Sequence, residues 1–443
     1  MTRPDLQLVA RALTTPPHAL AAPWLPHVRA AGLGGALRAR LPQDHPWRPA
    51  LRADALGQGA RHAVIRRAVF ALYTRWLDAG IPAILIKGFA LAEFEYAHDG
   101  ARFYGDVDVL IPPDPETVVR AVNVALAHGW RSDGLHAHPE AWTHESVHLL
   151  SPDGQVRLDV HRFLPSNWLA GTARSAALSR GLWQRARQVN WQGVPALRLH
   201  PLDEVVVAIA LGRCWGGDRG GLKGADYLDL ELLCRHYGLQ AAELAAHAAH
   251  LGATQTWKAF WQLCNPLQGQ LELRPAVTAP LLQAAAARDG VKRRPQVLGR
   301  LRRVLELAPY LFTGLGDMLR AMWAVRRGGD PRTHLQGWTP ATAVHIRLSL
   351  PQVNRTVSAV RLLTRWLHPR QKREGVCVPR AYATYRALRR LGYPAVFVSG
   401  VARSGAGVTG HAWVESDRGP LDAYGEPFNR RQFRVLFQWP PQD

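Results

Sequence analysis

The fold of the N-terminal half is decided by the stretch Gly105-Asp106-Val107-Asp108-Val109-Leu110. Its two aspartates stand two residues apart, with branched apolar residues between and after them. Because side chains alternate across a strand, both carboxylates face one side while Val107 and Val109 face a core. The pattern predicts a strand over residues 107–111, stopped by Pro112 and Pro113, that carries a pair of anionic groups.

A second predicted strand adds a third carboxylate. Its apolar residues occupy alternate positions and turn Asp159 to the opposite face in the run Val156-Arg157-Leu158-Asp159-Val160-His161. Strand patterns at 146–150 and 155–163 flank a turn sequence at 151–154, which predicts a hairpin. Carboxylates that converge from adjacent strands make a hard oxygen site suited to Mg²⁺, and two such ions can stabilise a phosphoryl displacement. An Asp-x-Asp pair alone would more often be a solvated strand face.

Residues upstream favour the metal-site interpretation. A buried strand predicted at 83–86 ends at Lys87-Gly88, and Arg102 precedes the aspartate pair. With the Asp-x-His strand, these residues resemble the uncharacterised bacterial branch of the polymerase-β-like nucleotidyltransferases, over roughly residues 55–265. The usual Gly-Ser or Gly-Gly turn of that superfamily is replaced here by Lys87-Gly88-Phe89.

The resemblance implies a small mixed sheet with flanking helices, an NTP substrate (in the first instance ATP) and Mg²⁺. It implies Asp106 and Asp108 as the primary metal ligands and Asp159 as the third acid. The cofactor-binding residues that it implies are Lys87, Gly88 and Arg102, with Lys87 on phosphate. Histidines are frequent in this stretch but follow no metal-ligand spacing, so we expect polar surface or supporting roles for His136, His138, His144, His148 and His161.

A second group of chemically active residues lies near the C-terminus. Cys377 precedes Pro379, which fits the first turn of a helix that ends near Leu391 with Gly392 as its stop. A helix N-terminus favours the thiolate, which is the nucleophilic form of cysteine. A lone cysteine would more often be a buried structural residue, so its partners decide the interpretation.

Those partners follow on a predicted hairpin. His411 and Trp413 share one face of a strand, and the turn at 416–419 returns the chain so that Asp422 reaches the same face. The order of nucleophile, base and orienting carboxylate predicts a catalytic triad of Cys377, His411 and Asp422. Glu415 competes for the third role, but it lies about 13 Å along the strand from His411.

This region resembles the transglutaminase-like, papain-fold leader peptidases of lasso-peptide biosynthesis, over about residues 346–443. The matching segments are Cys377-Val378-Pro379-Arg380-Ala381, Leu388-Arg389-Arg390-Leu391-Gly392-Tyr393-Pro394-Ala395, His411-Ala412-Trp413-Val414-Glu415 and Asp422. The resemblance implies hydrolysis of a precursor peptide between leader and core. It also implies partners: the precursor peptide, a separate leader-recognition protein and an asparagine-synthetase-like cyclase.

Alternative functions remain open at this point. The C-terminal nucleophile could catalyse acyl transfer, as in transglutamination, and the N-terminal domain could be a nucleotide-sensing or peptide-holding scaffold without turnover. The glycine pattern at 405–410 matches a dinucleotide-binding motif, but it leads into a strand instead of a helix, so it predicts a connector.

Length and composition set the remaining expectations. We predict an α+β protein of 443 residues with a helical cap (1–54), a nucleotidyltransferase-like domain (55–265), a helical linker region (266–345) and a papain/transglutaminase-like cysteine peptidase domain (346–443). The formal net charge of +21 comes mostly from arginine and predicts an attraction to anionic partners, but no nucleic-acid motif is present. Four cysteines without a C-x-x-C pair, and no signal peptide or long apolar run, predict a cytoplasmic protein with no membrane span. The two groups of chemically active residues in separate domains predict a bifunctional enzyme.

Overall fold

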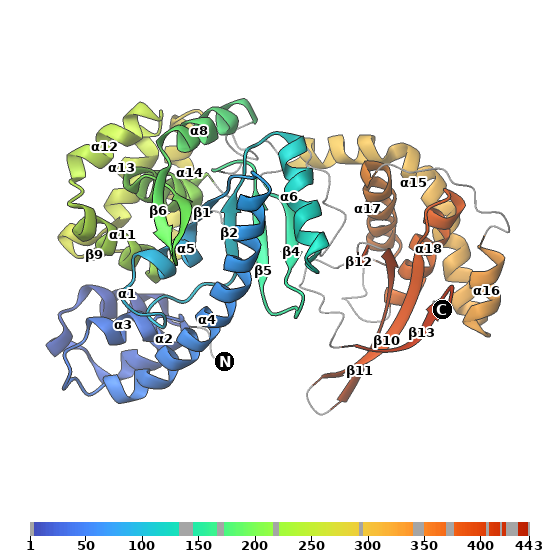
Figure 1. Cartoon of the computed structure of the whole chain (residues 1–443), viewed down its shortest axis with the longest axis horizontal. Helices are drawn as coiled ribbons and strands as arrows, with labels where there is room; N and C mark the ends of the chain where they lie inside the picture. Colours follow the sequence, from blue (N-terminus) through green and yellow to red (C-terminus); the bar gives the residue numbers. More distant parts are fainter. Residues whose placement is uncertain are drawn as a thin grey trace. The chain divides into compact units, whose positions relative to one another are not determined.

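Two compact units make up the chain in a computed structural model (Figure 1). Unit 1 comprises residues 1–124, 140–146 and 155–294, and unit 2 comprises residues 125–139, 147–154 and 295–443. The structure describes residues 4–132, 145–165, 172–215, 221–291, 296–339, 350–368, 376–404, 407–416, 419–421 and 433–441.

Unit 1 begins with short helices, as predicted for its first residues. They are α1 (Leu6–Thr14), η1 (Pro17–Ala19), η2 (Ala22–Trp24), α2 (Leu25–Ala30) and α3 (Gly34–Arg40). Asp5 caps α1 by accepting hydrogen bonds from the backbone N–H groups of Gln7 and Leu8. Helix α4 (Arg48–Asp78) starts earlier than the Arg61 predicted from its apolar stripe. Its first turns lack that stripe but are rich in alanine and arginine, which are strong helix formers.

Seven strands form one mixed sheet, most of which belongs to unit 1, and this sheet confirms the predicted fold class. In chain order they are β1 (Ile84–Ile86), β2 (Val107–Leu110), β3 (Arg131–Ser132), β4 (Glu145–Leu150), β5 (Arg157–His161), β6 (Arg187–Trp191) and β7 (Val194–Arg198). The spatial order is β3-β4-β5-β2-β1-β7-β6. Strand β2 is antiparallel to β1 and parallel to β5, and β1 is parallel to β7. The predicted hairpin brings β4 next to β5.

One hairpin of this sheet was not anticipated. Strands β6 and β7 pair antiparallel through a two-residue turn at Gln192 and Gly193. Both turn residues have positive φ, 52° and 86°, as the commonest two-residue hairpin turns require. The sequence signal for this hairpin is Gly193 in the turn, preceded by the apolar residues Val189 and Trp191 at alternate positions.

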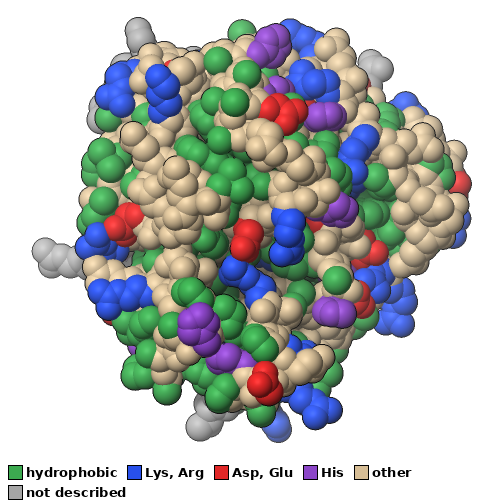
Figure 2. All heavy atoms as spheres, turned by 90° about the vertical axis from the view of Figure 1, so that its left-hand side faces the viewer, with side chains coloured by type: hydrophobic (Ala, Val, Ile, Leu, Met, Phe, Trp, Pro, Cys, Tyr) green, Lys and Arg blue, Asp and Glu red, His purple; other side chains and the backbone are tan. Residues whose placement is uncertain are grey.

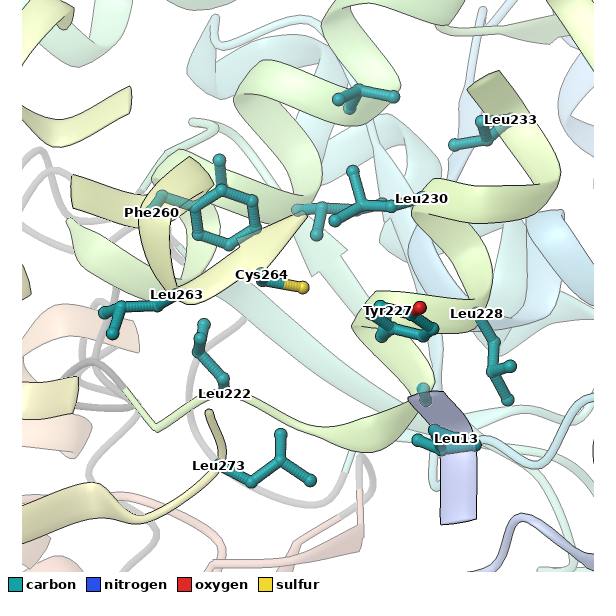
Figure 3. Close-up of a cluster of buried hydrophobic side chains, with 14 of the residues drawn as sticks. Leu13, Leu222, Tyr227, Leu228, Leu230, Leu233, Phe260, Leu263, Cys264 and Leu273 are labelled. Carbon is teal, nitrogen blue, oxygen red and sulfur yellow. The ribbon is translucent and has the colours of Figure 1, made fainter. Parts of the chain in front are cut away.

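Helices cover this sheet and build the larger core of unit 1. They are α5 (Lys87–Phe94), α6 (Pro115–Ala127), α8 (Thr172–Arg185), α9 (Pro201–Asp203), the π-helix η3 (Glu204–Leu211), α10 (Gly212–Cys214), α11 (Gly224–Tyr237), α12 (Ala241–His250), α13 (Thr254–Leu263) and α14 (Pro275–Arg288). A small ladder of β8 (Cys264–Asn265) and β9 (Gln270–Leu271) frames the 3₁₀ turn η4 (Pro266–Gln268). Figure 3 shows the core around Cys264, where leucines from several elements meet Phe260 and Tyr227. Asp114 caps α6 as predicted, accepting from the Thr117 N–H at 2.7 Å.

A buried ion network ties α5 to the β6–β7 hairpin and to α11. The Glu95 carboxylate accepts hydrogen bonds from Arg187 (2.9 Å), Arg198 (3.1 Å) and the Tyr237 hydroxyl (2.9 Å). Arg198 also donates to Glu204 at the start of the π-helix, at 2.7 Å. The Arg198 and Glu95 side chains are 0% and 1% exposed, so this network lies in the protein interior.

Unit 2 packs helices against a four-stranded antiparallel sheet. The helices are α15 (Gln296–Arg327), α16 (Pro331–Gly337), α17 (Leu350–Leu367) and α18 (Cys377–Arg390). The sheet has the order β12-β11-β10-β13, with β10 (Val396–Ser404), β11 (Gly407–Ser416), β12 (Gly419–Pro420) and β13 (Arg434–Trp439).

One face of helix α15 contributes to the apolar core of unit 2, although the helix falls within the predicted linker region. Met318 and Ala321 of α15 share one buried apolar cluster with Leu388 of α18 and Val414 of β11. Asp317 of α15 forms ion pairs of 2.9 Å with two arginines of α18, Arg386 and Arg390. The long helix is therefore fastened to α18 by both apolar and ionic contacts.

Basic residues are concentrated in the C-terminal part of the chain. Residues 296–443 contain 23 Lys and Arg against nine Asp and Glu, which gives +14 of the total +21. On the face drawn in Figure 2, Lys and Arg side chains are scattered among acidic and apolar ones. Among the described residues, no helix has both the length and the apolar character that a bilayer crossing requires.

Candidate functional site

Two of the three predicted acidic residues meet in the middle of the unit 1 sheet. Asp108 of β2 and Asp159 of β5 are register partners on parallel strands, so their side chains leave the same face at adjacent positions. Both are buried, at 6% and 4% exposure. Asp106 lies just before β2 and is exposed. The sheet thus brings Asp108 and Asp159 together and leaves Asp106 at the rim.

Lys87 and His161 both contact the Asp108 carboxylate. Lys87 follows Ile86, the register partner of Asp108, which places its ammonium group 2.6 Å from Oδ1 of Asp108. The Nε2 atom of His161 lies 2.7 Å from the same oxygen. Burial acts to raise the pKa of Asp108, but Lys87 and His161 outweigh it and hold this pKa well below its ordinary value. Asp108 is therefore an anion in the folded protein.

The backbone of Lys87 is in a conformation that few non-glycine residues adopt. Its φ is 57°, in the left-handed region, and it is the first residue of α5. Such backbone strain concentrates at functional sites, where the surrounding structure holds it in place. The conformation turns the chain sharply from β1 into α5 and leaves the Lys87 side chain beside the acidic pair.

The acidic pair suits a divalent cation in kind and charge. Two buried carboxylates in register repel one another unless cations lie close, and carboxylate oxygens are the ligands that Mg²⁺ prefers. Side chains already supply such cations, because Arg157 Nε lies 2.9 Å from Asp159 Oδ1 and Lys87 contacts Asp108. Among the residues that the structure describes, no three His, Cys, Asp or Glu side chains are arranged so as to hold a metal ion.

The segment that leads to Asp106 is held by two helices. Arg61 of α4 donates to the carbonyl oxygens of Tyr104 (2.6 Å) and Gly105 (2.8 Å). His62 of α4 contacts the Tyr104 hydroxyl through Nδ1 (2.7 Å) and Glu93 through Nε2 (2.8 Å). These contacts were not predicted from the sequence, because they join residues about forty positions apart. They fix the backbone immediately before the aspartate pair.

Gly88 lets this segment approach α5. A Cβ atom at position 88 would lie 2.7 Å from the Cβ of Tyr104. We expect Gly88→Ala to lower the free energy of unfolding by about 1–3 kcal/mol, because either α5 or Tyr104 must shift. Gly105→Ala is the matched control, since a Cβ there meets no atom within 4 Å. Urea unfolding of both variants checks this, and equal midpoints would contradict the close packing.

Arg102 lies in a different set of contacts from the acidic pair. Its guanidinium group donates to both carboxylate oxygens of Asp229 on α11, at 2.8 and 2.7 Å. Burial opposes the charge on Arg102, but Asp229 outweighs it and raises the pKa of Arg102. The described contacts thus make Arg102 a tether between α11 and the segment before Asp106, whereas the sequence resemblance implied a cofactor-binding role.

In unit 2, Cys377 is the first residue of α18, as predicted. Pro379 lies in the first turn, and the helix gives way to Gly392, whose φ is 79°. Cys377 is partly exposed, whereas the three other cysteines are buried and all four are free thiols. Exposure at a helix N-terminus distinguishes Cys377 as the accessible thiol of the chain.

His411 lies on β11, which packs against α18. Its ring stacks with that of Trp413, at a centroid distance of 6.0 Å and an interplanar angle of 17°. The ring of Phe433 lies 5.7 Å from the imidazole, centroid to centroid, at an interplanar angle of 42°. Burial, and then the nearby Arg380 guanidinium, lower the pKa of His411 to about 4. His411 is therefore neutral near pH 7, the form in which it can accept a proton.

Arg380 is a candidate site residue to which the sequence pattern assigned no role. It lies three positions after Cys377 on the same helix face, is 0% exposed, and acts electrostatically on His411. A fully buried guanidinium is costly to desolvate, so arginine is rarely found in such a place without a specific role. The sequence signal for Arg380 as a site residue is its position about one helical turn after Cys377.

Arg380→Gln is expected to raise the pKa of His411 from about 4 by up to roughly one unit, because the guanidinium disfavours the imidazolium. The sign follows from removing a positive charge beside a cationic acid. NMR titration of ¹³C-labelled histidine, assigned with His411→Asn, measures the shift. Arg365→Gln, at an exposed arginine of α17, is the control that should leave it unchanged. An unaltered titration in Arg380→Gln would mean that burial alone sets this pKa.

The other residues predicted from the sequence lie partly outside the described residues. Asp422 lies outside the described residues, and so do His136, His138 and His144 of the N-terminal half. Glu415 accepts a hydrogen bond from the Trp413 indole at 2.7 Å. Of the glycine-rich pattern at 405–410, residues 407–410 already belong to strand β11 and pair with β10, so the predicted connector is wrong for these four residues.

A mixed sheet with a buried carboxylate pair, and a helix-borne cysteine against an antiparallel sheet, together define a protein with two enzyme-type domains. The chain belongs to the family described as uncharacterised nucleotidyltransferase, whose profile matches residues 25–268. A second profile, that of the transglutaminase-like superfamily, matches residues 318–438. Both domains therefore belong to enzyme superfamilies, as predicted. No curated protein and no solved structure matches the chain.

Proposed function

We propose that this protein is a bifunctional enzyme of lasso-peptide maturation, in which the C-terminal domain is a cysteine peptidase that removes the leader from a precursor peptide. The observation that carries the proposal is an accessible thiol, Cys377, at the N-terminus of a helix that packs against the strand of a neutral His411. The transglutaminase-like match over residues 318–438 supports the same class of chemistry.

The proposed cleavage proceeds in two halves. His411 takes the proton of the Cys377 thiol, and the sulfur attacks the carbonyl carbon of the bond between leader and core. The amine of the core leaves with the proton that His411 returns, and a thioester with the leader remains. Water, deprotonated by His411, then attacks the thioester, and Cys377 regains its proton as the leader is released. Asp422 is proposed to hold the imidazole in the required tautomer.

The N-terminal domain is proposed to transfer a nucleotidyl group from an NTP, with ATP as the first candidate. Asp106, Asp108 and Asp159 would hold Mg²⁺, which when bound would neutralise phosphate charge. Lys87, at the end of β1 and beside Asp108, would contact the phosphates. Gly88 would keep the backbone close to Tyr104, so that the segment before Asp106 stays in place. The family match over residues 25–268 supports this assignment.

The proposal is tested with the precursor peptide encoded beside this gene, together with any leader-recognition protein and asparagine-synthetase-like cyclase encoded there. Mass spectrometry of the products distinguishes the two reactions that a thioester allows. A leader fragment that has gained water supports the peptidase, and a fragment carrying an added amine supports acyl transfer. An intact precursor in the presence of all partners contradicts both.

The scaffold alternative for the N-terminal domain makes a different prediction. Isothermal titration with ATP and Mg²⁺ on the full chain, repeated with Asp108→Asn, measures binding. Release of pyrophosphate in the presence of candidate acceptors measures turnover. Binding that Asp108→Asn removes, with no pyrophosphate from any acceptor, would favour a nucleotide-sensing scaffold over a transferase.

A further inference from the structure

One oxygen atom of unit 1 is approached by two nitrogen atoms. Oδ1 of Asp108 lies 2.6 Å from Nζ of Lys87 and 2.7 Å from Nε2 of His161, and those two nitrogens are themselves 3.4 Å apart. The carboxylate is buried, so its charge requires a close cation. In the structure as it stands, the Lys87 ammonium supplies that cation.

A divalent ion could not share this oxygen with Lys87 in place. An ammonium group at hydrogen-bonding distance from the ligand oxygen would lie within a few ångströms of the metal, and like charges at such distances in a buried site repel strongly. Metal binding at Oδ1 of Asp108 therefore favours a displacement of Lys87 from that oxygen.

Lys87 can leave Asp108 at low energetic cost only if another anion is present to pair with its ammonium group. Its side chain is 33% exposed, against 9% for Asp108, so the ammonium can swing towards solvent without leaving the fold. Its four-carbon stem is flexible, and phosphate is an anion that lysine binds as a point charge. A nucleotide whose phosphates lie above the acidic pair would give Lys87 a phosphate to bind when the metal binds to the Asp108 carboxylate.

We propose that Lys87 is an exchangeable internal cation: it leaves Asp108 for the substrate phosphate as the divalent metal enters, which makes metal and nucleotide bind cooperatively. This inference rests on the proposed nucleotidyl-transfer function of unit 1. Metal alone meets a site already neutralised by Lys87, and nucleotide alone meets a lysine already paired. When both bind, Asp108 exchanges the ammonium for the metal and Lys87 exchanges the carboxylate for the phosphate, so neither charge is left without a partner.

The test uses the full chain, Mn²⁺ and the non-hydrolysable ATP analogue AMPCPP. Electron paramagnetic resonance measures free Mn²⁺ with and without the analogue, for the wild type and for Lys87→Met. We expect the analogue to tighten Mn²⁺ binding to the wild type at least about tenfold, since affinity coupling of 5–150-fold is typical of linked sites. In Lys87→Met, Mn²⁺ alone should bind at least about tenfold more tightly than to the wild type, and the analogue should add little.

Two further variants make the experiment decisive. Lys258→Met removes the same charge from an exposed position on α13 and should behave as the wild type. Lys87→Arg keeps the charge and should keep the coupling, and urea unfolding of each variant identifies any loss of structure. If Lys87→Met binds Mn²⁺ and AMPCPP with wild-type affinities and coupling, the exchange is wrong while nucleotide binding stands. If neither ligand binds to any variant, both the exchange and the proposed function fall.

Discussion

Replacing Cys377 by alanine is expected to abolish cleavage of the precursor peptide, with a fall in kcat of at least about 10⁴-fold. The thiol forms the bond to the substrate, and the other three cysteines cannot replace it, because they are buried in the core of unit 1. The loss should appear in kcat/KM as well, since the missing interaction exists only from the transition state onward. Product formation is followed by mass spectrometry at saturating precursor.

The control for this prediction is Cys234→Ala. Cys234 lies in the core of unit 1, where burial raises the pKa of its thiol to about 11. Its removal should lower stability modestly and leave cleavage unchanged. Leader cleavage that persists in Cys377→Ala, with mass spectrometry showing the same product termini, would refute the peptidase assignment and leave the carboxylate site of unit 1 as the functional centre.

Replacing Glu95 by alanine is expected to lower the free energy of unfolding by about 3–5 kcal/mol. The carboxylate is 1% exposed and holds Arg187, Arg198 and the Tyr237 hydroxyl. Without it, the buried guanidinium group of Arg198 and the partly exposed one of Arg187 lose their shared anion, and Arg198 is left with Glu204 as its carboxylate partner. The cost is that of leaving buried positive charge uncompensated, which exceeds the net value of the ion pairs themselves.

Glu272→Ala provides the matched comparison. Glu272 also pairs with an arginine, Arg274, but that arginine side chain is 47% exposed, and surface pairs contribute from 0 to about 1 kcal/mol. Urea unfolding followed by tryptophan fluorescence on the full chain measures both variants. Similar midpoints for Glu95→Ala and Glu272→Ala would show that solvent reaches the network and that the buried description is wrong.

Local patterns predicted the elements of both units with fair accuracy. The Asp114 cap of α6 and the Gly392 stop of α18 were correct because they depend on residues within a few positions of one another. The alternation at Val107 and Val109 correctly identified β2 as a strand, and the turn at 151–154 correctly predicted that β4 and β5 are neighbours. For these features, the chemistry of neighbouring residues is sufficient information.

Features that depend on contacts between residues far apart in the chain were not predicted from the sequence. The pairing of Arg102 with Asp229 joins positions 127 residues apart, and no local signal announces it. Arg380 looks like an ordinary surface arginine until α18 is packed on its sheet. The Lys87–Asp108 contact follows from the register of β1 against β2, which a single sequence does not determine. The predicted triad and metal ligands therefore remain predictions that experiments on the whole chain must decide.

The attachment of α15 has a practical consequence for producing the cysteine domain separately. A truncated chain that starts at residue 346 would lack Met318, Ala321 and the Asp317 anion, all of which face α18. The uncovered helix would present apolar surface to water next to two unneutralised arginines, and patches of this kind promote aggregation. An expression fragment intended for enzymology should therefore begin before Gln296, so that the long helix is carried along with the catalytic cysteine.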